Sequence, residues 1–326
     1  MNVPAKAQRI VGPSGRRLAL GALLLSALIA GCGRSSTRID AAAAYHSESP
    51  SILAVGAENQ YANVISQIGG KYVSVTAIMS DPDTDPHTFE ASPGVAQAVS
   101  AAKLIVQNGV GYDPFMNKIE SATANASRKS IEMQTLLGLP ASTRNPHLWY
   151  EPTTMPKLAA RLVTDLTALE PAHAVYFKAN AARFDAALEP WRAALANFEK
   201  RHPGTPVATT EPVGDYMLFA AGTDNLTPWN LQADIMNGVD PAPQDVTLQD
   251  NLFKDHRVKV FLYNQQVTDT LTQSFLKLAA EYHVPVVGVY ETMPLGYSYQ
   301  SWMLDEVKAL NRAVTAGKST TKLGPP

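Results

Sequence analysis

Cysteine is almost absent from this chain, since Cys32 is the single cysteine among 326 residues. An intramolecular disulfide is therefore excluded. Long apolar runs are also scarce: beyond the first 31 residues none approaches the roughly 20 residues that a membrane-spanning helix needs. Basic tracts are missing as well, and no Lys/Arg stripe alternates with aromatic residues. The sequence thus gives no support for nucleic-acid binding.

The amino terminus has the charge and apolar pattern of an export signal. Four basic residues and no acidic residue lie within residues 1–31: Lys6, Arg9, Arg16 and Arg17. An apolar run over 18–30 follows them and is too short for a comfortable spanning helix. A basic segment followed by such a run is typical of a cleaved signal peptide.

The end of this run adds a lipid attachment site. Ile29-Ala30-Gly31-Cys32 resembles a bacterial lipobox, which implies cleavage before Cys32 and lipid attachment to its sulfur. We interpret residues 1–31 as a lipoprotein signal peptide and the small, polar residues 32–50 as a flexible tether. Residues 1–31 hold four of the 27 basic residues and none of the 29 acidic ones, so the rest of the chain carries a formal charge of −6. We expect a soluble body that is extracytoplasmic and lipid-anchored to the cell membrane.

Strand and helix patterns alternate through the first half of the mature chain. Apolar, β-branched runs predict strands at 52–56, 72–78 and 103–107, with a weaker strand near 129–133. Amphipathic stretches predict helices near 58–68, 93–101 and 113–122. Strands that alternate with helices favour a parallel sheet covered on both faces.

The second half repeats this rhythm after a purely helical middle. Helices are predicted near 153–169 and 172–201, with a bend or interruption at Pro190. Further strands are predicted at 206–209, 258–263 and 284–290, and further helices near 212–221, 243–254, 269–282 and 299–314. The expected fold is therefore α/β, with two lobes that each hold a mostly parallel sheet flanked by helices and are joined by one long connecting helix. We expect an N-terminal lobe at 51–170, the connecting helix at 171–202, a C-terminal lobe at 203–316 and a disordered tail at 317–326.

Two of the seven histidines lie in loops suited to a ligand. His87 follows the second predicted strand, and His147 lies in a proline-flanked turn before a helix. Glu211 and Glu291 follow the predicted strands that end at 209 and 290. Ligands of α/β sheets bind at the carboxyl ends of the strands. We interpret the remaining histidines as surface or helix-end residues.

These four side chains form a plausible cage for a divalent transition metal. Two ionised carboxylates and two neutral imidazoles would neutralise the ion. The four residues have no fixed short spacing, however, so spacing alone leaves metal binding open. A secreted metallohydrolase, with Glu211 or Glu291 as general base, is an alternative that no HExxH or nucleophile-elbow motif supports.

The motifs around the two histidines resemble those of one known protein family. Residues 85–93, Asp-Pro-His-Thr-Phe-Glu-Ala-Ser-Pro, resemble the DPHxxE-x-[ST]-P motif of the zinc/manganese solute-binding lipoproteins of bacterial ABC importers. Residues 145–152 resemble that family's DPHxWxDP motif, with Asn145 and Glu151 in place of its aspartates. Residues 291–296, and the helix that begins near 299, resemble its last ligand loop and the helix after it.

The resemblance implies two lobes that hold a metal between them, with His87 and His147 as the first two ligands. Glu211 falls where relatives carry His or Glu, and Glu291 falls where most carry Asp. Asp215 and Glu90 are the nearest competing carboxylates. The implied cargo is one Zn(II) or Mn(II) ion, and the sequence leaves these two metals close to even. The implied function is delivery to an ABC permease and its ATPase by a monomeric protein without enzymatic activity, with a surface adhesin as the alternative.

Overall fold

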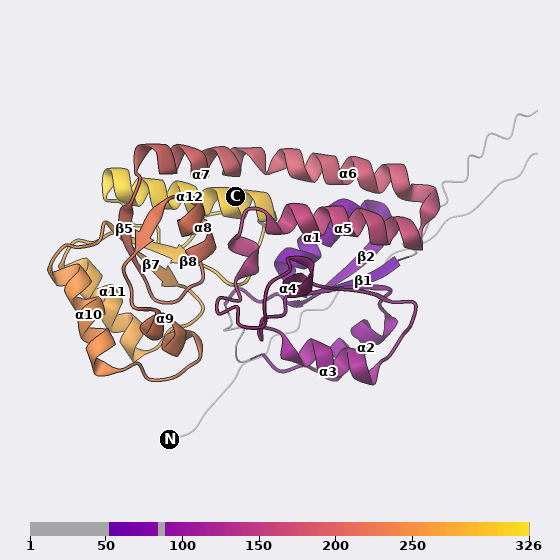
Figure 1. Ribbon diagram of the computed structural model, residues 1–326, viewed down its shortest axis with the longest axis horizontal. Coiled ribbons are helices and arrows are strands. Elements are labelled where there is room, and N and C mark those ends of the chain that lie inside the picture. Colours follow the sequence, from indigo (N-terminus) through magenta and orange to yellow (C-terminus); the bar gives the residue numbers. More distant parts are fainter. Residues whose placement is uncertain (1–51, 84–88, 326) are drawn as a thin grey trace, which may run out of the picture. The chain divides into compact units, whose positions relative to one another are not determined.

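The computed structural model describes residues 52–83 and 89–325 of the chain. The signal peptide, the tether, Cys32 and His87 lie outside these residues. Within them are two four-stranded sheets, with strand orders β2-β1-β3-β4 and β6-β5-β7-β8. Every strand pairing in both sheets is parallel. Helices flank the sheets (Figure 1), so the expected α/β fold with two parallel sheets is confirmed.

The first sheet is built from the apolar runs of the first half. Its strands are β1 (Ile52–Glu58), β2 (Val73–Met79), β3 (Leu104–Gln107) and β4 (Lys129–Glu132). The helices between and after them are α1 (Asn59–Gly69), α2 (Pro93–Ala101), α3 (Pro114–Ala122) and α4 (Met133–Leu136). All four residues of β3 are buried, as expected of a strand whose two faces are both covered.

The second sheet contains one strand that the sequence patterns did not predict. Its strands are β5 (Thr205–Thr209), β6 (Thr223–Asn225), β7 (Val260–Asn264) and β8 (Val286–Val289). Its helices are α8 (Asp215–Ala220), α9 (Trp229–Met236), α10 (Pro243–Lys254) and α11 (Thr270–Glu281). The unpredicted β6 is a polar edge strand of three residues, Thr-Asp-Asn, and carries no apolar alternation.

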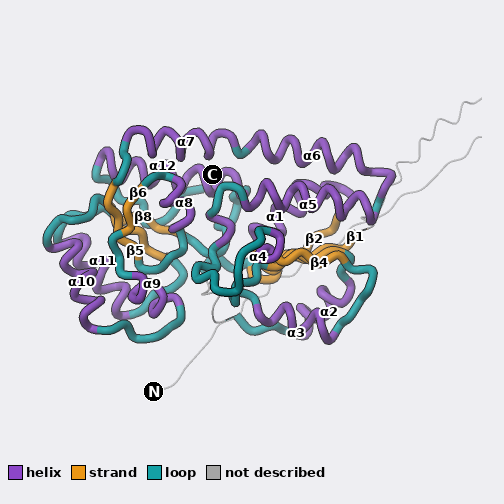
Figure 2. The backbone as a smooth tube through the Cα atoms, viewed as in Figure 1, coloured by secondary structure: helices purple, strands orange, loops and turns teal. Residues whose placement is uncertain are grey.

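Four further helices connect and cover the two sheets (Figure 2). They are α5 (Thr154–Leu169), α6 (Ala174–Ala187), α7 (Glu189–Arg201) and α12 (Tyr299–Ala316). The expected single connector is two helices in succession, α6 and α7, with the break at Leu188. Pro190 explains the break, because proline lacks the N–H that would continue the hydrogen bonds of the preceding helix. Helix α6 packs on α1 and α5, whereas α7 packs on α12.

The carboxyl-terminal segment departs from the disordered tail expected at 317–326. Thr320 pairs with Val287 of β8 and exchanges backbone hydrogen bonds with Val286 and Gly288. The hydroxyl of Tyr297 donates to the carbonyl of Gly324 at 2.6 Å. Because β8 is an edge strand, its unpaired backbone groups attract a further segment. The described part of this segment, to residue 325, therefore covers the edge of the second sheet.

One apolar core extends across both sheets. Its largest cluster joins residues of the first half, such as Trp149, with Val207 and Leu262 of the second sheet and Trp302 of α12. The rings of Tyr150 and Trp302 meet edge to face, with centroids 5.6 Å apart. The described residues accordingly all belong to one compact unit. Among the described residues no helix is long and apolar enough to cross a membrane.

Candidate metal site

Three of the predicted ligands lie at the ends of regular elements in the structure. His147 directly precedes the 3-10 helix Leu148–Tyr150, Glu211 follows β5, and Glu291 follows β8. Strands β5 and β8 both neighbour β7 in the second sheet. Because all strands there are parallel, their carboxyl ends share one edge, and Glu211 and Glu291 emerge from it on either side of β7. The three side chains are almost completely buried, with at most 1% exposure.

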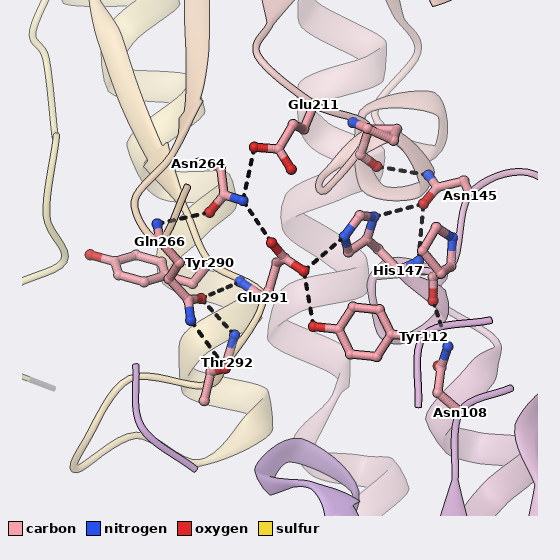
Figure 3. A network of polar contacts seen from close by, with 12 residues as sticks. Asn108, Tyr112, Asn145, His147, Glu211, Asn264, Gln266, Tyr290, Glu291 and Thr292 are labelled. Carbon is pink, nitrogen blue, oxygen red and sulfur yellow. Dashed lines mark hydrogen bonds and ion pairs between the residues drawn. The ribbon is translucent and has the colours of Figure 1, made fainter. Parts of the chain in front are cut away.

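A network of hydrogen bonds joins these three residues (Figure 3). His147 Nε2 lies 3.2 Å from Glu291 Oε2, so one residue from each half of the chain forms the central contact. Asn264, the last residue of β7, links the two glutamates: its Nδ2 donates to Glu211 Oε1 at 3.2 Å and to Glu291 Oε1 at 2.7 Å. The structure therefore brings His147, Glu291 and, through Asn264, Glu211 to one place.

Asn145 fixes the orientation of the His147 ring. Its Oδ1 accepts from His147 Nδ1 at 2.8 Å and from the His147 backbone N–H at 3.0 Å. The Asn145 amide is itself oriented, because its Nδ2 donates to the carbonyl of Pro212 at 2.7 Å. Asn145 therefore holds a proton on Nδ1, and Nε2, which shares a second proton with Glu291 Oε2 in the described structure, is the nitrogen that can ligate a metal once that proton is displaced.

Tyr112 contacts Glu291 from the first half of the chain. Its hydroxyl donates to Glu291 Oε2 at 2.9 Å, and its ring meets that of His147 edge to face. Burial and then the Glu291 carboxylate raise the pKa of the Tyr112 phenol well above its ordinary value. The phenol therefore stays protonated and acts as a hydrogen-bond donor to Glu291.

The loop that carries Tyr112 is held in an unusual conformation. Gly109, Val110 and Gly111 take successive positive φ angles of 78°, 55° and 74°. For a β-branched residue such as Val110, the left-handed region costs roughly 1–2 kcal/mol. The cost is offset by fixed partners: Asp113 accepts the N–H of Gly109, and Gln134 accepts the N–H of Val110 at 2.8 Å. These contacts, which lie within the first half of the chain, fix the backbone that carries Tyr112.

The backbone of Glu291 is fixed from both halves. Gln266 Oε1 accepts from the N–H groups of Glu291 and Thr292 at 2.7 and 2.8 Å. Gln60 of α1 donates to the carbonyl of Glu291 at 3.2 Å. Little freedom remains for the segment from which the Glu291 side chain projects.

The other side chains considered as metal ligands are His87, Glu90 and Asp215. His87 lies outside the described residues. The competing carboxylates do not join the network: Glu90 is exposed, and Asp215 accepts a hydrogen bond from Asn225 at 3.0 Å. Within residues 52–83 and 89–325, no three His, Cys, Asp or Glu side chains have the arrangement of a metal centre. The described network is thus a hydrogen-bonded arrangement in which Asn264 separates the two carboxylates.

A cleft of about 410 Å³ lies beside this network. Its lining includes Tyr112 and Pro146 of the first half and Trp229 of the second. Arg144 lies over the Trp229 ring, 5.8 Å from its centroid, at the same cleft. The buried network therefore has solvent-accessible space on the side of Tyr112 and Pro146.

Comparison with known proteins decides the family. The family model described as zinc-uptake complex component A, periplasmic, matches residues 55–313. The chain belongs to this family. The family expected from the sequence motifs, the zinc/manganese solute-binding proteins of ABC importers, is therefore confirmed.

Three known relatives are distantly similar to this chain. The manganese-binding lipoprotein MntA of Bacillus subtilis is 26% identical over 164 residues, which are 48% of this chain and 50% of MntA. Two of the solved structures that match over nearly their whole length are the following. The periplasmic zinc binding protein TroA from Treponema pallidum is 17% identical with a TM-score of 0.67, over 82% of this chain and 99% of that chain. ZnuA is 22% identical with a TM-score of 0.64, over 80% of this chain and 98% of that chain. These likenesses support the fold.

Proposed function

We propose that this protein captures one divalent transition metal ion, zinc or manganese, outside the cytoplasmic membrane and delivers it to an ABC permease and its ATPase. The family match over residues 55–313 supports this function. The names of relatives agree with it, since MntA is a manganese-binding lipoprotein and TroA a zinc binding protein. The observation that carries the proposal is the contact of 3.2 Å between His147 Nε2 and Glu291 Oε2, which joins a nitrogen and an oxygen ligand from the two halves of the chain.

The proposed ligand set is His87, His147, Glu211 and Glu291. Two carboxylates and two neutral imidazoles balance the charge of a divalent ion. This balance matters because Glu211 and Glu291 are buried, and a buried charge without a counterion is costly. The ion replaces the direct contact between His147 Nε2 and Glu291 Oε2 as the partner of these two side chains.

The remaining parts of the proposal concern the whole protein. Cys32 is the proposed point of lipid attachment, which anchors a monomeric body at the outer face of the cell membrane. A site closed by four protein ligands leaves no open position for a substrate, and this favours binding over catalysis. No contact in the described residues favours adhesion or hydrolysis over transport.

Metal binding by the stripped protein tests this function. We expect the chain, freed of metal and reloaded with Zn²⁺ or Mn²⁺, to bind one ion, with an affinity that falls on acidification because protons compete for the imidazoles. His147→Ala should abolish stoichiometric binding in a titration against a chromophoric chelator. Glu291→Gln keeps the size of the side chain but removes its charge, and should weaken binding by about 10-fold or more.

A surface histidine gives the matched control for these variants. His283 is exposed and lies outside the network, so His283→Asn should bind metal as the parent chain does. Thermal melting of each variant without metal separates loss of the site from loss of the fold. Undiminished binding in His147→Ala would refute the site assignment.

A further inference from the structure

Asn264 lies where it can control both carboxylates of the proposed site. It is the last residue of β7, between the strands that lead to Glu211 and Glu291, and it is fully buried. Its Nδ2 donates to one oxygen of each: Oε1 of Glu211 at 3.2 Å and Oε1 of Glu291 at 2.7 Å. A side-chain amide nitrogen carries two hydrogens, so both are used on these carboxylates.

The orientation of the Asn264 amide is fixed by the neighbouring backbone. Its Oδ1 accepts the N–H of Gln266 at 3.0 Å, which leaves Nδ2 facing the carboxylates. Its own backbone N–H donates to Thr210 Oγ1 at 3.1 Å. A flipped amide would lose the bond from Gln266 and place an oxygen against two carboxylate oxygens. Asn264 therefore acts as a rigid donor between the two glutamates.

The two oxygens of Glu291 have different surroundings as a result. Oε1 is bound by Asn264, whereas Oε2 lies 3.2 Å from His147 Nε2 and 2.9 Å from the Tyr112 hydroxyl. Since Nε2 is the nitrogen available for ligation, Oε2 is the oxygen that faces an incoming ion. Asn264 therefore holds the Glu291 carboxylate with Oε2 beside Nε2 and with Oε1 on its own amide, so coordination by both oxygens has to compete with this hydrogen bond. Glu211 is held by Asn264 through its Oε1 in the same way.

The number of oxygens offered bears on which metal binds. Two imidazole nitrogens and one oxygen from each carboxylate make four donor atoms, the number that structural zinc sites take in tetrahedral geometry. Manganese favours six-coordinate sites rich in oxygen, and two bidentate carboxylates with two imidazoles would supply six donors. If Oε1 of both glutamates were free, the site would thus move from the four-coordinate arrangement of zinc towards the six-coordinate arrangement of manganese.

We propose that Asn264 is a specificity-determining residue, which holds Glu211 and Glu291 in one-oxygen coordination and so favours zinc over manganese. The inference rests on the proposed function, because it needs an ion bound by these carboxylates. It assigns to Asn264 a role in choosing the cargo, in addition to any contribution to the fold.

Paired affinities for the two metals test the proposal. The stripped protein and Asn264→Leu, which removes both donors at similar size, are titrated with Zn²⁺ and with Mn²⁺ in competition with a chelator. We expect the ratio of zinc affinity to manganese affinity to fall by about 10-fold or more in the variant, a change of the size seen when groups that orient metal ligands are replaced. Co²⁺ serves as a spectroscopic probe, since four-coordinate Co²⁺ absorbs visible light far more strongly than six-coordinate Co²⁺. The absorption should be strong in the parent chain and weak in the variant.

Two further variants keep the test decisive. Gln249→Leu removes another fully buried amide of the second half, one that bonds Thr209 and Thr227. It should leave the affinity ratio and the Co²⁺ spectrum unchanged. Asn264→Ala applies the same test at smaller volume if the leucine variant does not fold.

The outcomes separate this inference from the proposed function. Equal loss of zinc and manganese affinity, with an unchanged Co²⁺ spectrum, would overturn the role of Asn264 and leave metal capture intact. A parent chain that binds neither metal would overturn both proposals.

Discussion

At the scale of single residues, each proposed ligand in the described structure is oriented by a neutral neighbour. Asn145 holds Nδ1 of His147, and Asn264 holds Oε1 of Glu291. Such neighbours fix the ligand atom that faces the ion and reduce the freedom lost on binding. We therefore expect a site whose affinity depends on amide side chains nearly as much as on the ligands.

Asn145 gives a direct test of this dependence. Asn145→Leu leaves Nδ1 of the buried His147 without its acceptor, so metal affinity should fall by about 10- to 100-fold. Asn145→Asp keeps an acceptor at the same place and should retain affinity within about 10-fold of the parent chain. Competition with a chelator measures both, and equal affinities of the parent and leucine variants would contradict the orienting role.

Part of the site could be predicted from the sequence, because two of its residues directly follow apolar runs that are recognisable as strands. Glu211 and Glu291 were predicted as residues that follow apolar strands, and the structure places them after the two strands on either side of β7. The same signal was available for Asn264, which ends the apolar run Val260–Asn264. It was not predicted as a site residue, because an amide side chain indicates a metal ligand less strongly than a carboxylate does. Tyr112 could not be predicted, because its partner Glu291 is 179 positions away.

At the scale of elements, predictions succeeded where the apolar period was clear and failed where the sequence mixes polar and apolar residues. Helix α10 was predicted with its observed bounds, 243–254. Helix α9 was missed, as was β6, because both lie in a region of mixed polarity.

His256 and His283 were interpreted as helix-end residues whose charge interacts favourably with the helix dipole. Both take positive φ, 51° and 56°, directly after the C-cap residues of α10 and α11.

His283 closes α11 in a position that normally favours glycine. Its N–H donates to Ala280, and the N–H of Val284 donates to Ala279, the two bonds of a Schellman motif. His283→Gly should raise the free energy of unfolding by about 0.5–1 kcal/mol, because glycine adopts this conformation without steric cost. Chemical denaturation measures the change. His283→Val, whose β-branched side chain resists positive φ, should lower stability, and equal stabilities of the two variants would contradict this account.

At the scale of the whole molecule, the segment that carries Glu291 is bonded to the first half of the chain. Asn59 of α1 exchanges two hydrogen bonds with the backbone of Met293, at 2.8 and 2.9 Å. The Tyr150 hydroxyl donates to the carbonyl of Tyr290 and accepts its N–H. These bonds bracket Glu291 on both sides. Any separation of the two halves that frees the buried ligands must break these bonds or leave the 290–293 segment with the first half.

A buried carboxyl near this junction makes the stability of the metal-free protein depend on pH. Burial raises the pKa of Glu306 on α12 from 4.5 to about 8, although Trp302 donates a hydrogen bond to it and the Tyr150 hydroxyl, whose proton it shares with the carbonyl of Tyr290, lies 3.1 Å away. The folded state therefore binds this proton more tightly than the unfolded state does. Its contribution to stability is complete below about pH 4.5 and is lost as pH rises through about 8.

Glu306→Gln should flatten this dependence. The parent chain should lose at most about 1.4 kcal/mol of unfolding free energy per pH unit from this group over that range, and the variant should lose less. Denaturant titrations at pH 5, 7 and 9 with a chelator present are the measurement. Glu199→Gln on the exposed face of α7 is the control and should follow the parent. An identical slope in the Glu306 variant would show that the group does not titrate as described.

The central claim is that the two halves hold one metal ion between His87, His147, Glu211 and Glu291. The most direct measurement is a crystal structure of the zinc-loaded protein with anomalous diffraction at the zinc edge. The account predicts one anomalous peak per chain, with His147 Nε2 and one oxygen of Glu291 about 2.0–2.2 Å from the ion. A zinc ion bound elsewhere, or a fully loaded protein in which His147 and Glu291 still contact each other without an ion, would contradict it.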